Sequence, residues 1–312
     1  MLRYIFKRLF IMVITIWIIV TLTFILMVSV PGSPFNNPDQ NMNETVRENL
    51  EKQYNLDQPY AIRYILYLKS VVTLDFGPSI KKPNDTVNDL LGRGFPISFE
   101  LGMVTILVAV ISGIILGVMA ALWHNGLIDY MAMTIAVLGI SIPNFVLAVL
   151  LIQTLAVNGI FPTARWESPV HMVLPVIALA TGPMAIIARL TRSTMLEVLT
   201  QDYIKMARAK GLSPWKIVIK HALKNALMPV VTIMGTLLAS ILTGTFVIEK
   251  IFAIPGMGKY FVESINQRDY PVIMGTTVFY SAFLIIMLFL VDLAYGILDP
   301  RIQIHKKGGD QK

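Results

Sequence analysis

The chain has 312 residues, of which 55% are hydrophobic and 14% charged, and its formal net charge is +7. Soluble domains carry about 25% charged residues, and the apolar residues here form long blocks, so the composition favours a multi-span membrane protein. The chain has no cysteine, which excludes disulfides, thiolate metal sites and cysteine nucleophiles.

The first predicted element is an apolar run over residues 9–30, preceded by Arg3, Lys7 and Arg8. A secretory signal has a shorter apolar core, of about 7–15 residues, and a small-residue cleavage site, which is missing here. A run of about twenty apolar residues instead predicts a retained membrane span. The basic residues before it favour a cytoplasmic N-terminus.

Residues 31–98 form the longest segment between apolar runs. Apolar residues recur in it at helical spacing, which predicts helices. We expect a small helical cap on the outer face, too short for an independent catalytic domain. The residues that carry this spacing are Val46, Leu50, Tyr54, Ile62, Ile65, Leu66 and Leu68.

Five further apolar runs are each near the length that a helix needs to cross the hydrocarbon core. They cover 99–123, 130–157, 172–190, 229–248 and 272–297. Proline predicts helix breaks at Pro143 in the third span, and at Pro175 and the Gly182-Pro183 pair in the fourth.

Lys and Arg concentrate between the fourth and fifth spans and in the C-terminal tail, so we expect both termini in the cytoplasm. The basic residues of the tail are Arg301, Lys306, Lys307 and Lys312.

A basic helix–turn–helix pattern separates the fourth and fifth spans. Gly211 is placed to end one helix, Ser213 to cap the next, and Pro214 to occupy its first position. Three lysines then recur at four-residue spacing and form a basic stripe. From the residues alone two interpretations stay open, an amphipathic helix lying on anionic lipid and a docking element for a soluble partner. The lysines are Lys216, Lys220 and Lys224.

Motifs for catalysis are missing from the sequence. The stretch "PGMGKY" has Tyr260 where a phosphate-binding loop needs Ser or Thr, so we interpret it as an outer turn and expect no ATP hydrolysis by this chain. The four histidines are scattered, and neither an H-E-x-x-H pair nor a G-x-S-x-G elbow occurs. Asp292 and Glu100, near span ends, are interpreted as interfacial carboxylates rather than as a proton relay.

The basic segment resembles the cytoplasmic coupling loop of ABC-importer permeases, whose motif runs Glu-Ala-Ala, three residues, Gly, nine residues, Ile-x-Leu-Pro. Ala207 and Gly211 match this motif. Lys205 takes the place of its glutamate and His221 the place of its isoleucine, and the proline comes later, at Pro229. The chain is similar along nearly its whole length to one branch, the permeases of oligopeptide, dipeptide and nickel importers, and most to the B-type subunit. The phrases that carry this likeness include "RLTRSTMLEVLTQDYIKMARAKGLS", "KHALKNALMPVVT", "IEKIFAIPGMGKYFVESINQRDYPV" and "LAYGILDPRI".

The resemblance implies an all-α integral membrane protein with six transmembrane helices, the type I ABC importer permease fold, and an extracytoplasmic helical insertion between helices 1 and 2. The domains would be 1–30 with helix 1, 31–98 outside, and a core at 99–312 with a coupling loop at 191–228. Such permeases sit in the bacterial cytoplasmic membrane. They work with a second, C-type permease, two cytoplasmic ABC ATPases that use ATP and Mg²⁺, and an extracytoplasmic peptide-binding protein. This chain would bind no cofactor, metal or nucleic acid, and would contact membrane lipid.

The resemblance also implies which residues act. The coupling residues would be Lys205, Ala207, Arg208, Lys210, Gly211, Leu212, Ser213, Pro214 and His221. A translocation path for oligopeptides should be lined by small and hydroxyl side chains. For each candidate on its own, small-residue helix packing is the better explanation, and the path is a hypothesis about the residues as a group. The candidates are Ser141, Pro143, Asn144, Gly235, Ser240, Thr243 and Gly244.

Two alternatives remain. Within the same family, the substrate would be a dipeptide or nickel. In a different class, the chain would be a self-contained ion-coupled carrier, which needs several deep titratable residues that are scarce here.

Overall fold

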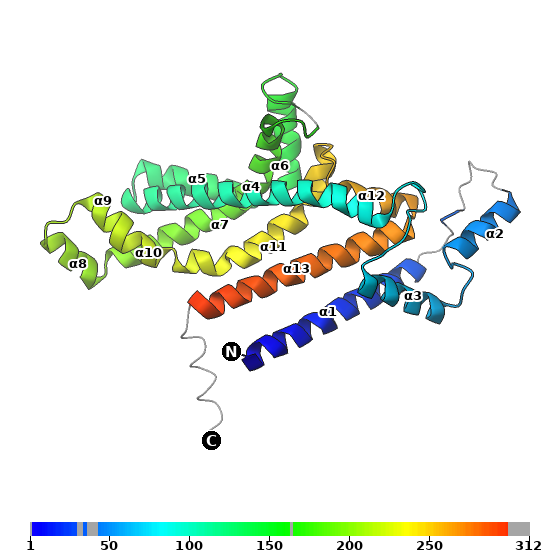
Figure 1. Cartoon of the computed structure of the whole chain (residues 1–312). Coiled ribbons are helices and arrows are strands. Elements are labelled where there is room, and N and C mark those ends of the chain that lie inside the picture. Colours follow the sequence, from blue (N-terminus) through cyan, green and yellow to red (C-terminus); the bar gives the residue numbers. More distant parts are fainter. Residues whose placement is uncertain (1, 30–33, 36–42, 163–164, 299–312) are drawn as a thin grey trace. The chain divides into compact units, whose positions relative to one another are not determined.

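Figure 1 shows the computed structural model of the chain, whose backbone is described for residues 2–29, 34–35, 43–162 and 165–298. Inside these ranges the side chains of residues 2–4, 243, 244, 292 and 294–298 are outside the description. The basic tail and the side chain of Asp292, both used above, therefore lie outside the described residues. The described secondary structure is helical except for an isolated antiparallel bridge between Pro78 and Thr86.

Five of the helices in the described part of the chain are long and apolar enough to cross a membrane. A sixth span results if the bent pair α5 (Leu127–Ser141) and α6 (Asn144–Leu151), which continues as a π-helical turn to Ala156, counts as one. This agrees with the all-α fold and the six predicted runs. The five are α1 (Leu2–Ser29), α4 (Val87–Leu122), α7 (Val173–Leu199), α11 (Met228–Ile251) and α13 (Tyr270–Leu298).

The break at Pro143 is confirmed, because α5 and α6 meet there at 106°. The break predicted in the fourth span is wrong, because α7 continues through Pro183. Pro175 occupies the third position of α7, where a backbone N–H has no acceptor within the helix, so proline costs little there. Pro183 is itself buried, and packing around it stabilises the helix despite one missing hydrogen bond.

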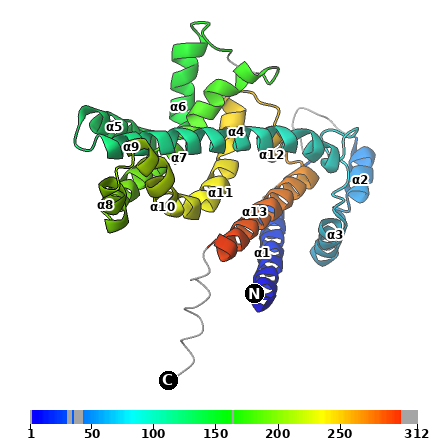
Figure 2. The same cartoon turned by 60° about the vertical axis from the view of Figure 1, so that its left-hand side comes forward.

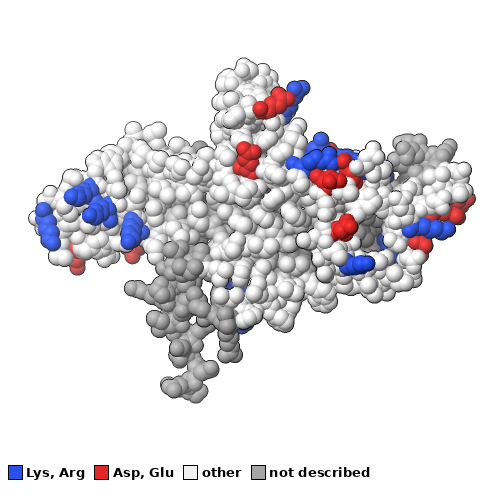
Figure 3. Space-filling view, viewed as in Figure 1, with Lys and Arg blue, Asp and Glu red and all other residues white. Residues whose placement is uncertain are grey.

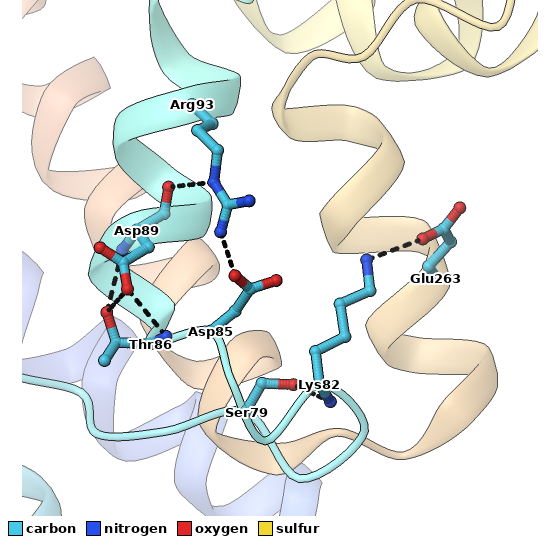
Figure 4. Close-up of polar contacts among 7 residues, drawn as sticks. All are labelled: Ser79, Lys82, Asp85, Thr86, Asp89, Arg93 and Glu263. Atoms are coloured by element: carbon cyan, nitrogen blue, oxygen red, sulfur yellow. Dashed lines mark hydrogen bonds and ion pairs between the residues drawn. The ribbon is translucent and has the colours of Figure 1, made fainter.

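Helix α4 begins at Val87, a dozen residues before the predicted span. Thr86 and Asp89 explain this start, because they form a reciprocal cap (Figure 4). Thr86 Oγ1 accepts from the Asp89 N–H at 3.1 Å, and Asp89 Oδ2 accepts from the Thr86 N–H at 3.0 Å. The sequence "TVND" contains this capping signal, with the threonine three residues before the aspartate.

The chain divides into two compact units, and α4 and α13 each contribute to both. Unit 1 comprises Met1–Ile97 and Gly256–Phe289. It contains α1, α2 (Glu44–Gln53), α3 (Tyr60–Thr73) and α12 (Met257–Gln267). The helical prediction for residues 43–76 is therefore confirmed, whereas "PGMGKY" is not simply a turn, since α12 begins at its Met257.

The core of unit 1 joins α1 to α3 and to the start of α13. Tyr67 of α3 packs against Phe24 of α1, with ring centroids 6.1 Å apart, and its burial raises its pKa. Only some of the apolar residues that recur at helical spacing in residues 31–98 are partly buried. Leu50, Tyr54 and Leu68 pack on this core, but four of the apolar residues are exposed: Val46, Ile62, Ile65 and Leu66.

Unit 2 comprises Ser98–Pro255 and Leu290–Lys312. Helix α7 packs against α5, α6 and α11. One apolar cluster joins α4, α7 and α11, through Ile106, Ile187 and Leu237. The residues between α7 and α11 form the short helices described next.

Candidate functional site

The connection between α7 and α11 folds into a compact helical element, which we call the docking knob and define as residues 202–226. It contains α8 (Asp202–Ala209), α9 (Pro214–Lys216), a π-helical segment (Ile217–Ala222) and α10 (Leu223–Ala226). Figures 1 and 2 show α8, α9 and α10 gathered at the end of α7. The helix–turn–helix predicted from the sequence is confirmed.

The turn between α8 and α9 is closed by two backbone hydrogen bonds. The N–H of Gly211 donates to the carbonyl of Arg208 at 2.9 Å, and the N–H of Leu212 donates to the carbonyl of Ala207 at 3.3 Å. This is a Schellman ending, and Gly211 supplies its left-handed residue with φ of +76°. Gly211 therefore ends α8 as the sequence predicted, because a residue with a Cβ is strained at that φ.

The start of α9 is also where it was predicted. Ser213 has extended backbone, its carbonyl accepts from the Ile217 N–H at 3.1 Å, and Pro214 holds the first helical position. The Ser213 side chain, however, makes no capping hydrogen bond. The fixed φ of Pro214 thus contributes to this start where the serine hydroxyl does not.

One face of the docking knob is buried against the ends of α4 and α7. Ile204 and Ala222 are 0% exposed, and they share a cluster with Met195 of α7 and Ala121 of α4. Two hydrogen bonds add to this packing. Thr194 Oγ1 on α7 donates to the carbonyl of Ala226 at 2.7 Å, and Asn225 Nδ2 donates to the Tyr203 hydroxyl at 2.7 Å. The docking knob is therefore packed and hydrogen-bonded to the end of α7.

The exposed surface of the docking knob carries both cations and large apolar side chains. Trp215 is 65% exposed, and Ile219 and Met206 are nearly as exposed. Figure 3 shows Lys and Arg side chains gathered over this end of unit 2. A lipid surface or a protein groove could cover such a mixed face. The exposed basic residues are Lys205, Arg208, Lys210, Lys216, Lys220 and Lys224.

The predicted coupling residues do not all share this face. Ala207 is buried in the chain's own cluster, and Leu212 and His221 are half-buried. Lys205 pairs with Asp202 of its own helix at 2.9 Å. The remaining predicted residues are exposed on the docking knob: Arg208, Lys210, Gly211, Ser213 and Pro214.

A cavity of about 250 Å³ lies inside unit 2 at the break between α5 and α6. Pro143 and Asn144 line it with Gly182 and Pro183 of α7 and Ser240 of α11. The structure thus brings together three of the predicted path residues.

The other predicted path residues are placed differently. The Ser141 hydroxyl donates to the Val137 carbonyl of its own helix at 2.8 Å, and Ser141 is not among the residues that line the cavity. At Gly235, an added Cβ would lie 2.2 Å from Val291 Cγ1. This glycine therefore serves close helix packing, the simpler of the two interpretations. The side chains of Thr243 and Gly244 lie outside the described residues.

Sequence reasoning missed a buried ion pair near the docking knob. Asp129, at the start of α5, is 2% exposed and accepts from Arg192 of α7 at 2.6 Å and 2.7 Å. Arg192 is one of several basic residues that follow the fourth predicted span. The available signal was a carboxylate at the edge of the third predicted span, 130–157, since ionisable groups are rare in membrane segments.

A second polar cluster, in unit 1, joins the loop before α4 to α12 and the start of α13. Asp269 is buried, and its carboxylate accepts from the N–H groups of Ile80 and Lys81, both at 3.1 Å, and from the Ser79 hydroxyl. Lys82 reaches Glu263 of α12 at 3.7 Å (Figure 4). The two connections, before α4 and between α11 and α13, therefore lie at the same end of unit 1.

Arg93 adds a further contact to this cluster. It forms an ion pair with Asp85, and its Nε donates to the Asp89 carbonyl at 3.2 Å (Figure 4). Charged contacts therefore join the loop before α4 to Glu263 and Asp269 and also to Arg93 of α4 itself.

Long apolar helices, a broken span and a packed helical knob between two spans are features of an integral membrane protein. The chain belongs to the family described as binding-protein-dependent transport system inner membrane component, whose sequence profile matches residues 113–304. The N-terminal profile of the same transport systems matches residues 1–102. The expected resemblance to ABC-importer permeases is therefore confirmed.

The relatives agree with the expected branch. The dipeptide transport system permease protein DppB of Bacillus subtilis is 72% identical over 99% of this chain and 100% of its own length. DppB of Lactococcus lactis and the oligopeptide transport system permease protein OppB of Haemophilus influenzae are each 40% identical over 97% of this chain and 100% of their own lengths. Their names match the B-type subunit predicted from the sequence.

A solved structure supports the fold. A chain of the inward-facing MetNI methionine ABC transporter superposes with a TM-score of 0.54 at 23% identity, covering 67% of this chain and 94% of that one. The type I ABC importer permease fold expected from the sequence is therefore confirmed.

Proposed function

We propose that this chain is the B-type membrane subunit of an ATP-driven importer of short peptides. The docking knob is the observation that carries the proposal. A helical element packed onto the end of α7, with an exposed face of tryptophan, isoleucine and lysines, is suited to fit a groove on a soluble ATPase. Movement of that ATPase would then reach the spans through α7.

Dipeptides are the substrates we favour. The sequence alone placed oligopeptides first, but the relative that is 72% identical is named for dipeptide transport, whereas relatives named for oligopeptide transport are 40% identical. Because substrate selection in such systems falls largely to a separate binding protein, longer peptides and nickel remain alternatives. An ion-coupled carrier is less well supported, since the buried carboxylate Asp129 is already paired with Arg192.

The partners in this proposal are a C-type permease, two ATPases that use ATP and Mg²⁺, and a binding protein that delivers the peptide from outside. In this proposal ATP and Mg²⁺ bind to the ATPases, and this chain binds no cofactor of its own. The basic face of the docking knob favours a cytoplasmic position for it, because Lys and Arg concentrate on that side of the bacterial cytoplasmic membrane. Both termini would then be cytoplasmic, and α2 and α3 would lie outside.

The first experiment is to tag the chain in its native membrane, extract it in mild detergent and identify by mass what co-purifies. We expect a second permease and ATPase subunits. The same complex in vesicles, with its binding protein outside and ATP inside, should accumulate a labelled dipeptide. A chain that is extracted alone or as a homo-oligomer, and vesicles that take up peptide without ATP, would both contradict the proposal.

Substitution of Trp215 by Ala tests the docking knob directly. An exposed tryptophan at the centre of an interface typically contributes about 2 kcal/mol or more, so ATPase binding should weaken about thirtyfold or more. The matched control is Trp17→Ala on α1, because Trp17 is also exposed, at 54% against 65% for Trp215. Equal ATPase binding by both variants would show that the docking knob is not the contact.

A further inference from the structure

The buried pair formed by Asp129 and Arg192 has a geometry that fixes two helices against each other. The Asp129 side chain is 3% exposed and that of Arg192 is 24% exposed. Arg192 Nε donates to Asp129 Oδ1 at 2.6 Å and Nη2 donates to Oδ2 at 2.7 Å. Two parallel hydrogen bonds to one carboxylate fix orientation as well as distance. The start of α5 is therefore held to α7 in both separation and rotation.

Two further contacts extend this pair to the turn between α4 and α5. The Asn125 N–H donates to Asp129 Oδ2 at 2.9 Å. Nδ1 of His124 lies 3.1 Å from Arg192 Nη2 and 3.2 Å from Asp129 Oδ2. The pair thus joins three segments, which are the turn, α5 and α7.

The pair lies next to the docking knob along α7. Met195, one helical turn beyond Arg192, is 0% exposed inside the cluster that buries the underside of the docking knob. Thr194, also beyond Arg192, bonds the Ala226 carbonyl at the knob's far end. A displacement of the docking knob therefore reaches Arg192 through packed contacts.

At its other end, α5 contributes Gly139 and Ile140 to the wall of the cavity. Gly139 sits so close to α7 that an added Cβ would lie 2.8 Å from Thr181 Cγ2. The chain then breaks at Pro143, and the cavity is lined on this side by Gly139, Ile140, Ile142, Pro143 and Asn144. Helix α5 is thus fixed to α7 at both ends, by an ion pair near the docking knob and by close packing near the cavity.

We propose that Asp129 and Arg192 are positioning residues that make α5 move with α7, so that displacement of the docking knob reaches the Pro143 break and changes the cavity. This inference rests on the proposed function. Without the pair, α7 would still follow the docking knob, but the start of α5 would be released. ATP hydrolysis would continue while less peptide crosses the membrane.

The test uses the complex of this chain with its partner subunits in vesicles, and measures peptide uptake and ATP hydrolysis in the same sample. For Asp129→Asn we expect hydrolysis to be retained and uptake per ATP to fall about tenfold, within the ~5–150-fold range of typical coupling between sites. The matched control is Glu51→Gln, which removes the charge from an exposed ion pair with Arg47 on α2 and should leave the ratio unchanged. Unchanged uptake per ATP in Asp129→Asn would overturn the proposal.

A second variant separates coupling from folding. The chain has no cysteine, so Asp129→Cys with Arg192→Cys introduces its only two thiols and leaves no buried charge unpaired. We expect low uptake per ATP in the double-cysteine variant before it is crosslinked. Uptake per ATP should recover after a short bifunctional thiol reagent links the two cysteines, and mass spectrometry verifies the link. The positioning role of Asp129 and Arg192 would be refuted if uptake per ATP stayed low in the crosslinked protein. It would also be refuted if uptake per ATP were normal before crosslinking. Failure of wild-type chain to bind ATPases would instead refute the proposed function.

Discussion

The backbone N–H of Leu212 donates to the carbonyl of Ala207 across the turn that ends α8, at 3.3 Å. Both side chains join the buried cluster beneath the docking knob. The turn therefore combines a Schellman hydrogen bond with the apolar contact that often accompanies it. This relationship sets the angle at which α9 leaves α8, and with it the shape of the exposed face.

Substitution of Gly211 by Arg should abolish transport while leaving the chain inserted in the membrane. Gly211 has φ of +76°, so a side chain there costs about 1–2 kcal/mol, and a large cation also obstructs the exposed turn. Uptake of labelled dipeptide is compared with the amount of chain in the membrane fraction. Gly159→Arg is the control, because Gly159 has φ of +74° and equally open surroundings away from the docking knob. Normal uptake by well-expressed Gly211→Arg would contradict the role of the turn.

Substitution of Ile204 by Ala should loosen the docking knob. Ile204 is 0% exposed, and truncation of a buried isoleucine costs about 2–5 kcal/mol. Hydrogen exchange of the amides in residues 202–226 should become faster, and ATPase binding should weaken. The neighbouring Met206→Ala removes a side chain that is 62% exposed and should change exchange little. Similar exchange in both variants would mean that this cluster does not stabilise the docking knob.

Substitution of Ser240 by Phe should narrow the range of peptides that are imported. Ser240 lines the cavity of about 250 Å³ beside Pro143, so a phenyl ring there removes space from the passage. Uptake of a tripeptide should fall more than uptake of a dipeptide. Thr232→Phe is the control on the same helix, since Thr232 is exposed and does not line the cavity. Equal effects on both peptide lengths would count against a path through this cavity.

Substitution of Asp269 by Ala should release the loop before α4. The Asp269 carboxylate accepts from two backbone N–H groups and a hydroxyl, and each hydrogen bond to a charged group contributes about 1.5–3 kcal/mol. Trypsin should cleave after Lys81 at least about tenfold faster in detergent-solubilised protein, whereas Pro83 blocks cleavage after Lys82. Asp57→Ala, at an exposed carboxylate in the same unit, should leave the cleavage rate unchanged. A protected loop in Asp269→Ala would show that Asp269 does not hold it.

Much of the docking knob could be predicted because its ends depend on local chemistry. Gly211 and Pro214 act through backbone angles that belong to single residues, so "KGLSPWK" specifies a helix, a turn and a helix wherever it stands. The outcome for Pro183 was different. A proline breaks an isolated helix, yet α7 passes through it because packing by neighbouring helices holds the chain, and neighbours are not visible in a local pattern.

The sequence by itself determined that this is an all-helical membrane protein, where most of its spans lie, where the third span breaks, and that a basic helical knob lies between the fourth and fifth. These features follow from hydropathy over about twenty residues and from the backbone limits of glycine and proline, both properties of short segments. Only the tertiary structure decided that Ala207 faces inward, that Gly235 serves packing, and that Asp129 finds Arg192 across 63 positions of sequence. Such pairings depend on how helices pack side by side, and that packing is determined jointly by residues that lie far apart in the sequence.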